Sequence, residues 1–380
     1  MVLKILEDCL LSIEDKRQGS KVRHPLRELI FLVFCGVLSG CDDYEDIVFY
    51  GEEKIDFLRQ YFPYKNGIAS VPTLSRLFSW LSPKFFLQLL QAFLSSYFPD
   101  LPKDLISIDG KTSRGSRDGA LRAAHHLTAF SSHAKLVLSH IRVDCKTNEI
   151  TAIPDLIETM NIEGAMITID AMGCQRDIAE LIICKKGEYL LGLKANQGRF
   201  HQDAQDLFPS MIENKTDYHV DEYEETEPNG GGRIETRKIT LTDNIMRLNT
   251  LHAWPGLKSV IKVERSRDIK GKKSFETSFY LSSKIMTAEE AARSIRSHWA
   301  IENSLHYVLD VAFCEDKSRV RKDNAPENMN ILRKIITNII QMLKKNAISN
   351  KEKKRSFKIY RKKFLISDLF FHKFLRGVNS

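Results

Sequence analysis

The stretch Leu105–Gly115, LISIDGKTSRG, combines a short apolar run, one acidic residue, and a glycine followed by basic and hydroxyl side chains. The apolar run predicts a buried strand that ends on Asp109, and Gly110 predicts a turn at that point. A carboxylate at the end of a buried strand is open to a ligand. We therefore expect partners for Asp109 elsewhere in the chain.

The overall composition is typical of a globular protein, with 43% hydrophobic and 28% charged residues. A chain of 380 residues can form two or three domains, or one large core with an insertion. The longest apolar run, near 29–38, is about half of the roughly 20 residues that a membrane span needs. Residues 1–17 lack the apolar segment of a secretion signal. The expectation is a cytoplasmic protein without a membrane partner.

The seven cysteines are scattered and include no C-x-x-C pair. This spacing favours reduced thiols without a function over a zinc site or a disulfide framework.

The net charge of +8 is concentrated near the C-terminus. Residues 344–363 contain ten Lys or Arg and one Glu, so the rest of the chain is close to neutral. Such a block binds polyanions by neutralising phosphates, and the interleaved Phe357, Tyr360 and Phe364 could stack or pack. A solvated, solubilising segment is the alternative. We expect a basic C-terminal tail over 346–380.

Residues 1–98 have the apolar spacing of helices and predict an all-helical N-terminal domain. Two of its helices flank the turn at 40–43 and could bind DNA as a pair, although helical bundles without that role are commoner. A domain boundary is expected at Pro99–Lys103.

Beyond this boundary the apolar period changes to that of strands, which predicts a mixed α/β sheet. Strands are expected at 105–109, 126–130, 136–143, 165–170 and 188–194. Helices are expected at 155–160, 175–186 and 196–208.

The segment at about 209–283 predicts an antiparallel β insertion. Its alternating stretches are 234–241, 259–267 and 275–281. A long helix then begins behind Thr287, which is expected to cap it, and a second helix covers 326–345. The prediction is an α/β domain over 103–345 that the insertion interrupts.

Three carboxylates, Asp109, Asp170 and Glu302, are candidate metal ligands. Asp109 and Asp170 each end a short apolar strand and precede a small residue, and Glu302 follows Ile301 on the long helix. An ionised carboxylate among apolar residues is costly unless it is paired or binds a cation. Oxygen ligands favour Mg²⁺ or Mn²⁺, and two such ions suit phosphodiester displacement. Singly, each residue is more often structural, and Asp-Gly alone is a turn signal.

The segments IDGK, ITIDAMGCQ, YLLGLKANQ, GGRIETR and HWAIENSLHYVLDVAFCED resemble the DDE transposases of bacterial insertion sequences, in particular the group that includes the H-repeat-associated proteins. The resemblance covers nearly the whole chain, and 1–98 is similar to the family's N-terminal associated region. It implies a ribonuclease-H-like core with a β insertion, and a metal-binding triad of Asp109, Asp170 and Glu302.

The chain also departs from its relatives. The broader class carries a Tyr, an Arg and a Lys around the glutamate, where this sequence has Ile295, His298 and Leu309. His298 precedes Glu302 by one helical turn, so it could donate to a phosphate or could simply be packed. The glycine run before Arg233 lacks a histidine that close relatives are expected to carry.

Several further residues are candidate DNA contacts, with a solvated surface as the alternative. The basic candidates are Lys111, Arg114, Arg117, Lys194, Arg319, Arg321 and Lys322. Trp254 and Trp299 could wedge against a displaced base, but packing is the commoner role of tryptophan.

The leading hypothesis is a Mg²⁺-dependent transposase, with Mn²⁺ as a possible substitute and two ions in the site. It would recognise terminal inverted repeats, nick a phosphodiester with water and join the freed 3′-hydroxyl to target DNA, as a homodimer in the DNA complex. The alternative is a catalytically inactive, DNA-binding relic or regulator. A hydrolase of small phosphate esters would leave the basic segment and the helical domain unexplained.

Overall fold

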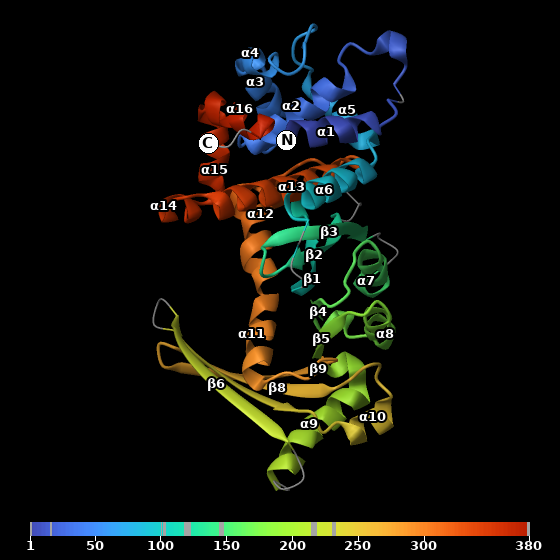
Figure 1. Cartoon of the computed structure of the whole chain (residues 1–380), viewed down its shortest axis with the longest axis vertical. Helices are drawn as coiled ribbons and strands as arrows, with labels where there is room; N and C mark the ends of the chain where they lie inside the picture. Colours follow the sequence, from blue (N-terminus) through green and yellow to red (C-terminus); the bar gives the residue numbers. More distant parts are fainter. Residues whose placement is uncertain are drawn as a thin grey trace.

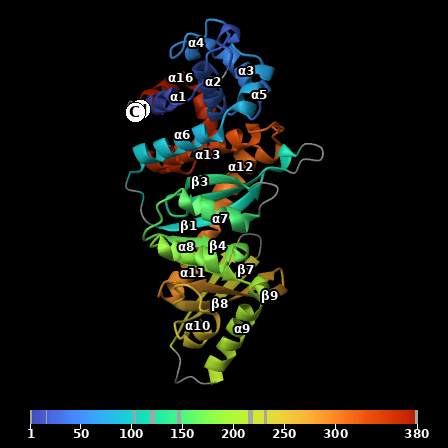
Figure 2. The same ribbon diagram turned by 90° about the vertical axis from the view of Figure 1, so that its right-hand side faces the viewer.

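The computed structural model describes residues 2–15, 17–99, 101, 104–117, 123–143, 148–213, 219–229 and 233–377. Figure 1 shows an elongated molecule in layers, with helices at one end, a sheet in the middle and long strands at the other end. The view turned by 90° shows the same succession of layers (Figure 2). Both ends of the chain lie in the helical layer (Figure 1).

A nine-stranded sheet has the order β3-β2-β1-β4-β5-β9-β8-β7-β6. The strands of its first half are β1 (Leu105–Thr112), β2 (His125–Ser131), β3 (Leu136–Val143), β4 (Met166–Ile169) and β5 (Glu188–Leu193). β1, β4 and β5 are parallel, whereas β2 and β3 run antiparallel to their neighbours. This arrangement confirms the predicted ribonuclease-H-like mixed sheet.

The turn predicted at Gly110 is wrong. β1 continues through Asp109 and Gly110, which pair with Thr128 and Leu127 of β2. A Cβ atom at Gly110 would collide with the carboxylate of Glu149 and with the ring of His125, which form an ion pair at 2.6 Å. Glycine is therefore required here by a close side-chain approach and not by a turn.

The predicted β insertion extends the core sheet. Its strands are β6 (Val220–Asn229), β7 (Arg233–Thr242), β8 (Ser259–Ile269) and β9 (Lys272–Ser282), with helices α9 (Gly198–Glu213) and α10 (Met246–His252). β9 pairs antiparallel with β5, so insertion and core form one sheet. The acidic residues of β6 face basic residues of β7, as in the ion pairs Glu222–Lys238 and Glu225–Arg237, both at 2.9 Å. The glycine run 230–232 lies outside the described residues.

Helices cover both faces of the sheet (Figure 1). α7 (Glu149–Glu158) and α8 (Arg176–Cys184) pack against one face and bury a shared apolar core. α7 begins earlier than predicted because the side chain of Asn148 caps it and accepts a hydrogen bond from the Thr151 N–H. On the other face, α11 (Ala288–His298) packs against the core strands and the insertion.

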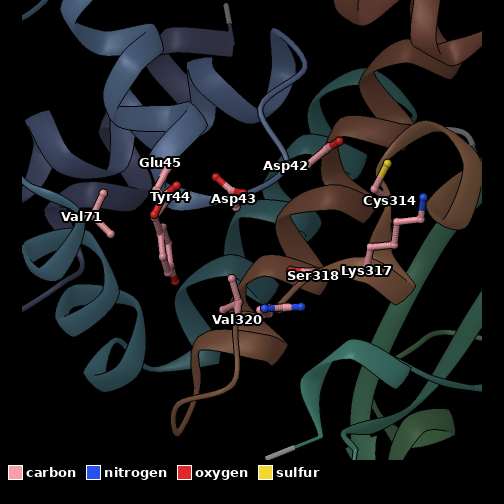
Figure 3. A pocket seen from close by; sticks show the side chains of 10 residues that line it. Asp42, Asp43, Tyr44, Glu45, Val71, Cys314, Lys317, Ser318 and Val320 are labelled. Atoms are coloured by element: carbon pink, nitrogen blue, oxygen red, sulfur yellow. The ribbon is translucent and has the colours of Figure 1, made fainter.

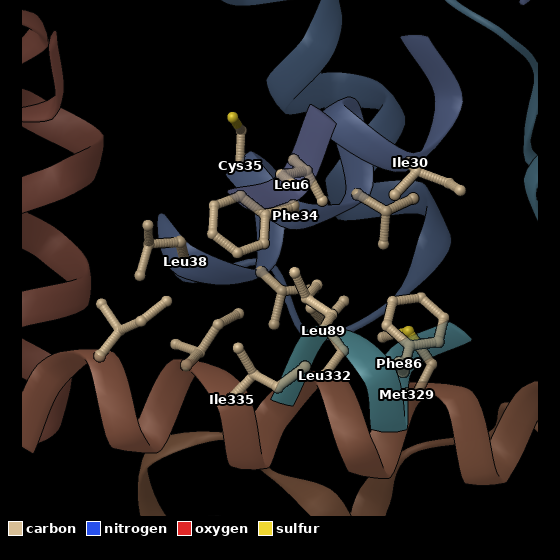
Figure 4. Packing of buried hydrophobic residues seen from close by; sticks show 14 of the residues in the cluster. Leu6, Ile30, Phe34, Cys35, Leu38, Phe86, Leu89, Met329, Leu332 and Ile335 are labelled. Atoms are coloured by element: carbon tan, nitrogen blue, oxygen red, sulfur yellow. The ribbon is translucent and has the colours of Figure 1, made fainter. Parts of the chain in front are cut away.

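The N-terminal region is helical, as predicted. Its helices are α1 (Val2–Leu11), α2 (Leu26–Leu38), α3 (Tyr44–Glu53), α4 (Ile55–Leu58), α5 (Val71–Trp80) and α6 (Pro83–Tyr97). They bury one large core together with the long helix α13 (Ala325–Asn346). Figure 4 shows Leu89 of α6 next to Leu332 of α13, below Phe34 of α2. This shared core fastens the helical region to the sheet, because Asn338 of α13 also bonds the backbone of Val137 in β3.

The basic C-terminal segment folds into α14 (Asn350–Lys353), α15 (Phe357–Ile366) and α16 (Asp368–Arg376). Tyr360 and Phe364 are buried in the large helical core. Arg361 is buried too, and its guanidinium donates to the carbonyl oxygens of Val37 and Cys41, each at 3.0 Å. The segment is therefore a structural part of the helical layer and not the expected tail.

Within the described part of the chain, no helix has both the length and the apolar character required to cross a bilayer. The described cysteines are free thiols, and Cys145 lies outside the described residues.

Candidate active site

Two parallel strands place Asp109 and Asp170 at one edge of the sheet. β1 and β4 pair in register up to Ile108 and Ile169, and each aspartate is the next residue. The carboxyl ends of neighbouring parallel strands meet at the same edge, where ligands of α/β sheets bind. The carboxylate of Asp170 accepts a hydrogen bond from the Met172 N–H at 3.0 Å and caps the short helix η3 (Ala171–Gly173).

The long helix that brings Glu302 to this edge is firmly anchored. Thr287 and Glu290 form a capping box at its start, as the sequence predicts. After α11 the helix continues as the π-helical turn η5 (Glu302–His306) and then as α12 (Tyr307–Ala312). Ile301 and Leu305 are buried in the helical core, so the opposite face presents Glu302 and His306 to the sheet. A π-helical turn inside an α-helix is frequent at functional sites.

A compact group forms between strand and helix. The Nδ1 atom of His306 lies 3.3 Å from Oε2 of Glu302 and 3.5 Å from Oδ2 of Asp109. Ligand atoms of these three residues all lie within 4.8 Å of one another. The structure thus brings two predicted carboxylates together with a histidine that the sequence analysis overlooked. The signal was present, because His306 follows Glu302 by four residues and shares its helical face.

The pKa values of the two carboxylates in this group shift in opposite directions. Burial is the main cause that raises the pKa of Asp109 to about 6; His306 acts to lower this pKa, and the nearby Glu302 and Asp170 act to raise it. A hydrogen bond with His306 lowers the pKa of Glu302. A buried carboxylate among like charges is costly in the free protein. A cation at this point would relieve that repulsion.

The donor set fits a divalent metal ion. Carboxylate oxygens are ligands for Mg²⁺ and Mn²⁺, whereas an imidazole nitrogen suits Mn²⁺ better than Mg²⁺. The Nε2 atom of His306 is buried without a hydrogen-bond partner among the described residues. Asp170 stands at the same edge, although its side chain lies outside the compact group and is exposed.

His298 faces the site from the helix. Its Nδ1 atom lies 3.2 Å from Oγ1 of Thr168 in β4, and the residue is half-buried. Burial lowers the pKa of His298, while Asp170 and Glu302 act in the opposite direction. These interactions place His298 near both Asp170 and Glu302.

Lys111 is held inside the protein. Its Nζ atom lies 2.8 Å from Asp310, 3.3 Å from Glu315 and 3.4 Å from Asp316. Burial alone would lower the pKa of Lys111, but these carboxylates raise it. Because its charge is already neutralised, the geometry does not support the expected phosphate contact.

Arg114, Arg319 and Arg321 lie on one surface, beside the joined loops at 113–117 and 315–322. The side chain of Arg114 is 83% exposed, and Arg319 and Arg321 are exposed as well. The Nε atom of Arg321 donates to the Gly115 carbonyl oxygen at 3.1 Å, which fixes the two loops together. Arg117 and Lys322 are also exposed.

Lys194 is exposed at the end of β5, beside the strand that carries Asp170. The turn after it is braced against the turn after Asp170. Asn196 donates to the Ala171 carbonyl oxygen at 2.7 Å, and Gln197 donates to the Cys174 carbonyl oxygen at 2.6 Å. These bonds place Lys194 at the same sheet edge as the carboxylates.

The two tryptophans differ in their surroundings. Trp254 is buried against Phe200 with ring centroids 5.3 Å apart, so it packs. Trp299 is 50% exposed and lies one turn before Glu302.

A separate cavity of about 540 Å³ lies between the start of α3 and the loop after α12. Figure 3 shows Asp43 and Glu45 on its helical side, with Lys317 and Ser318 opposite. None of the residues in the compact carboxylate group lines it. The cavity is therefore distinct from the candidate metal site.

Comparisons with known proteins agree with this geometry. Residues 100–339 match the family model described as the transposase DDE domain, and residues 7–94 match the associated N-terminal model, DDE_Tnp_1-associated. The chain is 37% identical over 363 residues to "Putative transposase YncI" of Escherichia coli O157:H7, covering 93% of this chain and 92% of that protein. It is 39% identical over 347 residues to "H repeat-associated putative transposase YhhI" of E. coli K12, covering 90% of this chain and 91% of that protein. The chain belongs to the DDE transposase family.

Proposed function

We propose that the protein is an active, metal-dependent DNA transposase. It cleaves phosphodiester bonds at the ends of its element and transfers the freed 3′-ends into target DNA, in the cytoplasm and as a homodimer on DNA. The observation that carries the proposal is the approach of Asp109, Glu302 and His306 to within ligand distance of one another, next to Asp170. A protein that only binds DNA would leave this gathering of carboxylates unexplained.

Each residue has a defined role in this proposal. Asp109, Asp170 and Glu302 hold two Mg²⁺ or Mn²⁺ ions, and His306 positions Asp109 and Glu302. Bound ions of this kind activate an attacking oxygen and stabilise the leaving oxygen of an in-line displacement. His298, Lys194, Arg114, Arg319 and Arg321 contact the DNA backbone. Phosphoryl transfer depends mainly on such positioning and charge neutralisation.

The two reactions balance without a protein nucleophile. In cleavage, a water oxygen forms a bond to phosphorus and the P–O3′ bond breaks, which leaves a 3′-hydroxyl and a 5′-phosphate. In strand transfer, that 3′-hydroxyl oxygen attacks a target phosphodiester, and a target 3′-oxygen leaves with the proton.

The test is cleavage of DNA that carries the sequences flanking the gene. Wild-type protein with Mg²⁺ or Mn²⁺ should nick this DNA, and Asp109→Asn, Asp170→Asn and Glu302→Gln should not. The matched control is Asp177→Asn, which changes an exposed carboxylate in the first turn of α8. Cleavage that survives the three changes would exclude the proposed site. If the wild type binds DNA but does not cleave it, the result would support the alternative of a catalytically inactive, DNA-binding relic or regulator.

A further inference from the structure

Four lysines surround a second hollow of the molecule. Lys135, Lys344, Lys345 and Lys353 line a groove of about 840 Å³, which we call the lysine groove. Lys135 lies in the turn between β2 and β3, Lys344 and Lys345 belong to the last turn of α13, and Lys353 ends α14. Segments that are far apart in the sequence therefore gather four ammonium groups around one space.

Among the described residues, the lining of the lysine groove supplies no acidic side chain to compensate these charges. The neighbouring carboxylate of Glu352 pairs with Arg355 and Lys363. The Nζ atom of Lys344 donates to the Arg355 carbonyl oxygen, which leaves its charge unpaired. A cluster of like charges in a hollow raises the local concentration of anions.

The lysines are held in place by aromatic rings. The Nζ atom of Lys344 lies 5.1 Å from the centre of the Phe357 ring, and that of Lys345 lies 6.0 Å from the centre of the Phe98 ring. Burial and the charge of Lys135 lower the pKa of Lys344. Cation–π contacts orient an ammonium group without neutralising it, so its charge remains available to a ligand.

The groove lies close to the candidate active site. Asn303, Ser304 and Val308 line it, and Glu302 directly precedes them. Ser304 and Val308 share one face of the helix, and Glu302 and His306 share another. A helix with its side chains is about 10 Å across, so groove and carboxylates are separated by roughly that distance. One strand of DNA spans this distance with about three nucleotides.

We propose that the lysine groove binds the sugar–phosphate backbone of DNA a few nucleotides away from the bond that the carboxylates cleave. This inference rests on the proposed function, which supplies DNA as the ligand. Lysine is a compact charge that neutralises phosphates and does not read bases. The groove therefore contributes affinity that is independent of sequence, and it fixes how the strand passes the long helix.

The same basic segment provides a matched control. Lys351, Lys354 and Lys358 are exposed and do not line the groove. A triple change of these residues to Gln removes as much charge as a triple change of Lys135, Lys345 and Lys353, which are also exposed. Both variants should fold, because no buried group is altered, and circular dichroism checks this.

The experiment measures how the affinity for DNA depends on salt. The probe is a fluorescein-labelled duplex of arbitrary sequence, and fluorescence anisotropy gives Kd between low and moderate salt. Each lost phosphate contact reduces the magnitude of the slope of log K against log salt by about 0.9. The groove variant lacks three lysines, so its slope should be smaller in magnitude than that of the wild type by about 3. The control variant should keep the wild-type slope. Equal slopes in the two variants would overturn the proposal.

Binding and cleavage can fail independently in this design. If the wild type does not cleave DNA but only the groove variant loses slope, the proposed function is wrong and the groove is confirmed. If the wild type cleaves DNA and the groove variant retains the full slope, the groove alone is wrong. Asp109→Asn should bind the probe with the wild-type slope in the absence of metal.

Discussion

The Nδ1 atom of His306 lies 3.5 Å from Oδ2 of Asp109, and this contact joins strand β1 to the long helix. The same nitrogen lies 3.3 Å from Glu302, four residues earlier in the helix. Because His306 is buried and the helix is capped at Thr287, the separation of the two carboxylates is set by the fold. The strand and the helix thus define the candidate metal site together.

Replacing His306 should weaken the response to metal more than it weakens folding. In His306→Ala, the Mn²⁺ concentration required for half-maximal DNA cleavage should rise by roughly 10- to 100-fold, as is common when a partner of a metal ligand is lost. Titration of Mn²⁺ in the cleavage assay measures this. His219→Ala, at an exposed position in the insertion, serves as the control. An unchanged metal requirement in His306→Ala would show that the histidine only packs.

Because of the buried Lys334, the free energy of unfolding should depend on pH in the alkaline range. Its Nζ atom contacts Oγ1 of Thr128 at 2.7 Å and Nδ1 of His140 at 2.6 Å, and burial lowers the pKa of Lys334 to about 7. Above pH 7 the unfolded chain, with an ordinary lysine pKa near 10.5, binds more protons than the folded one. The free energy of unfolding should therefore rise with pH in this window, by up to about 3 kcal/mol over two pH units.

Urea unfolding at neutral and alkaline pH tests this dependence. The rise should be present in the wild type and in Lys358→Met, an exposed control, and absent in Lys334→Met. A rise of the same size in Lys334→Met would assign it to other groups.

Arg361 should be essential for attaching the basic segment to the helical layer. Its guanidinium lies 2.9 Å from Asp42 and donates to the backbone carbonyl oxygens of Val37 and Cys41. Arg361→Met removes these buried hydrogen bonds and the ion pair with Asp42, so the free energy of unfolding should fall by about 3 kcal/mol. Lys362→Met removes the same charge from an exposed neighbour and should change stability by less than about 0.5 kcal/mol. Similar losses in the two variants would contradict the structural role.

Gly110→Ala should also destabilise the protein, because the new methyl group would displace the Glu149–His125 ion pair. We expect a loss of about 1–3 kcal/mol, typical of overpacking. Gly19→Ala is the control, since a Cβ atom there meets no other atom within 4 Å. If the cause is steric, combining Gly110→Ala with Glu149→Ala should restore part of the lost free energy of unfolding. If Gly110 were merely a turn residue, the double change would restore none of it.

The strands of the core were predictable because their apolar runs are short and bounded by polar turns. The Thr287 cap and α13 were predictable because each has a strong local pattern, a capping box in the first case and apolar residues at helical spacing in the second. Asp109 was predicted to end its strand; it lies where the parallel pairing of β1 with β4 ends, but β1 itself continues past it. The predicted turn at Gly110 was wrong, because glycine is required there by the close approach of Glu149, a residue distant in sequence.

Other features could not be read from local pattern. The acidic strand β6 lacks apolar alternation because its side chains pair with basic residues of β7. The high charge of 344–363 left open whether Tyr360 and Phe364 stack on a ligand or pack, and the structure buries both on one face of α15. The ion pairs of Lys111 depend on a loop some 200 residues later, so a sequence pattern shows only an unpaired lysine after Asp109.

The most direct test of the account is calorimetric titration of Mn²⁺ into the purified protein. The wild type and Asp177→Asn should bind the ion with the same affinity, and Asp109→Asn and Glu302→Gln should each weaken binding by at least about tenfold. That result would establish the carboxylates of β1 and the long helix as the metal site. Wild-type Mn²⁺ affinity in both Asp109→Asn and Glu302→Gln would contradict the central claim.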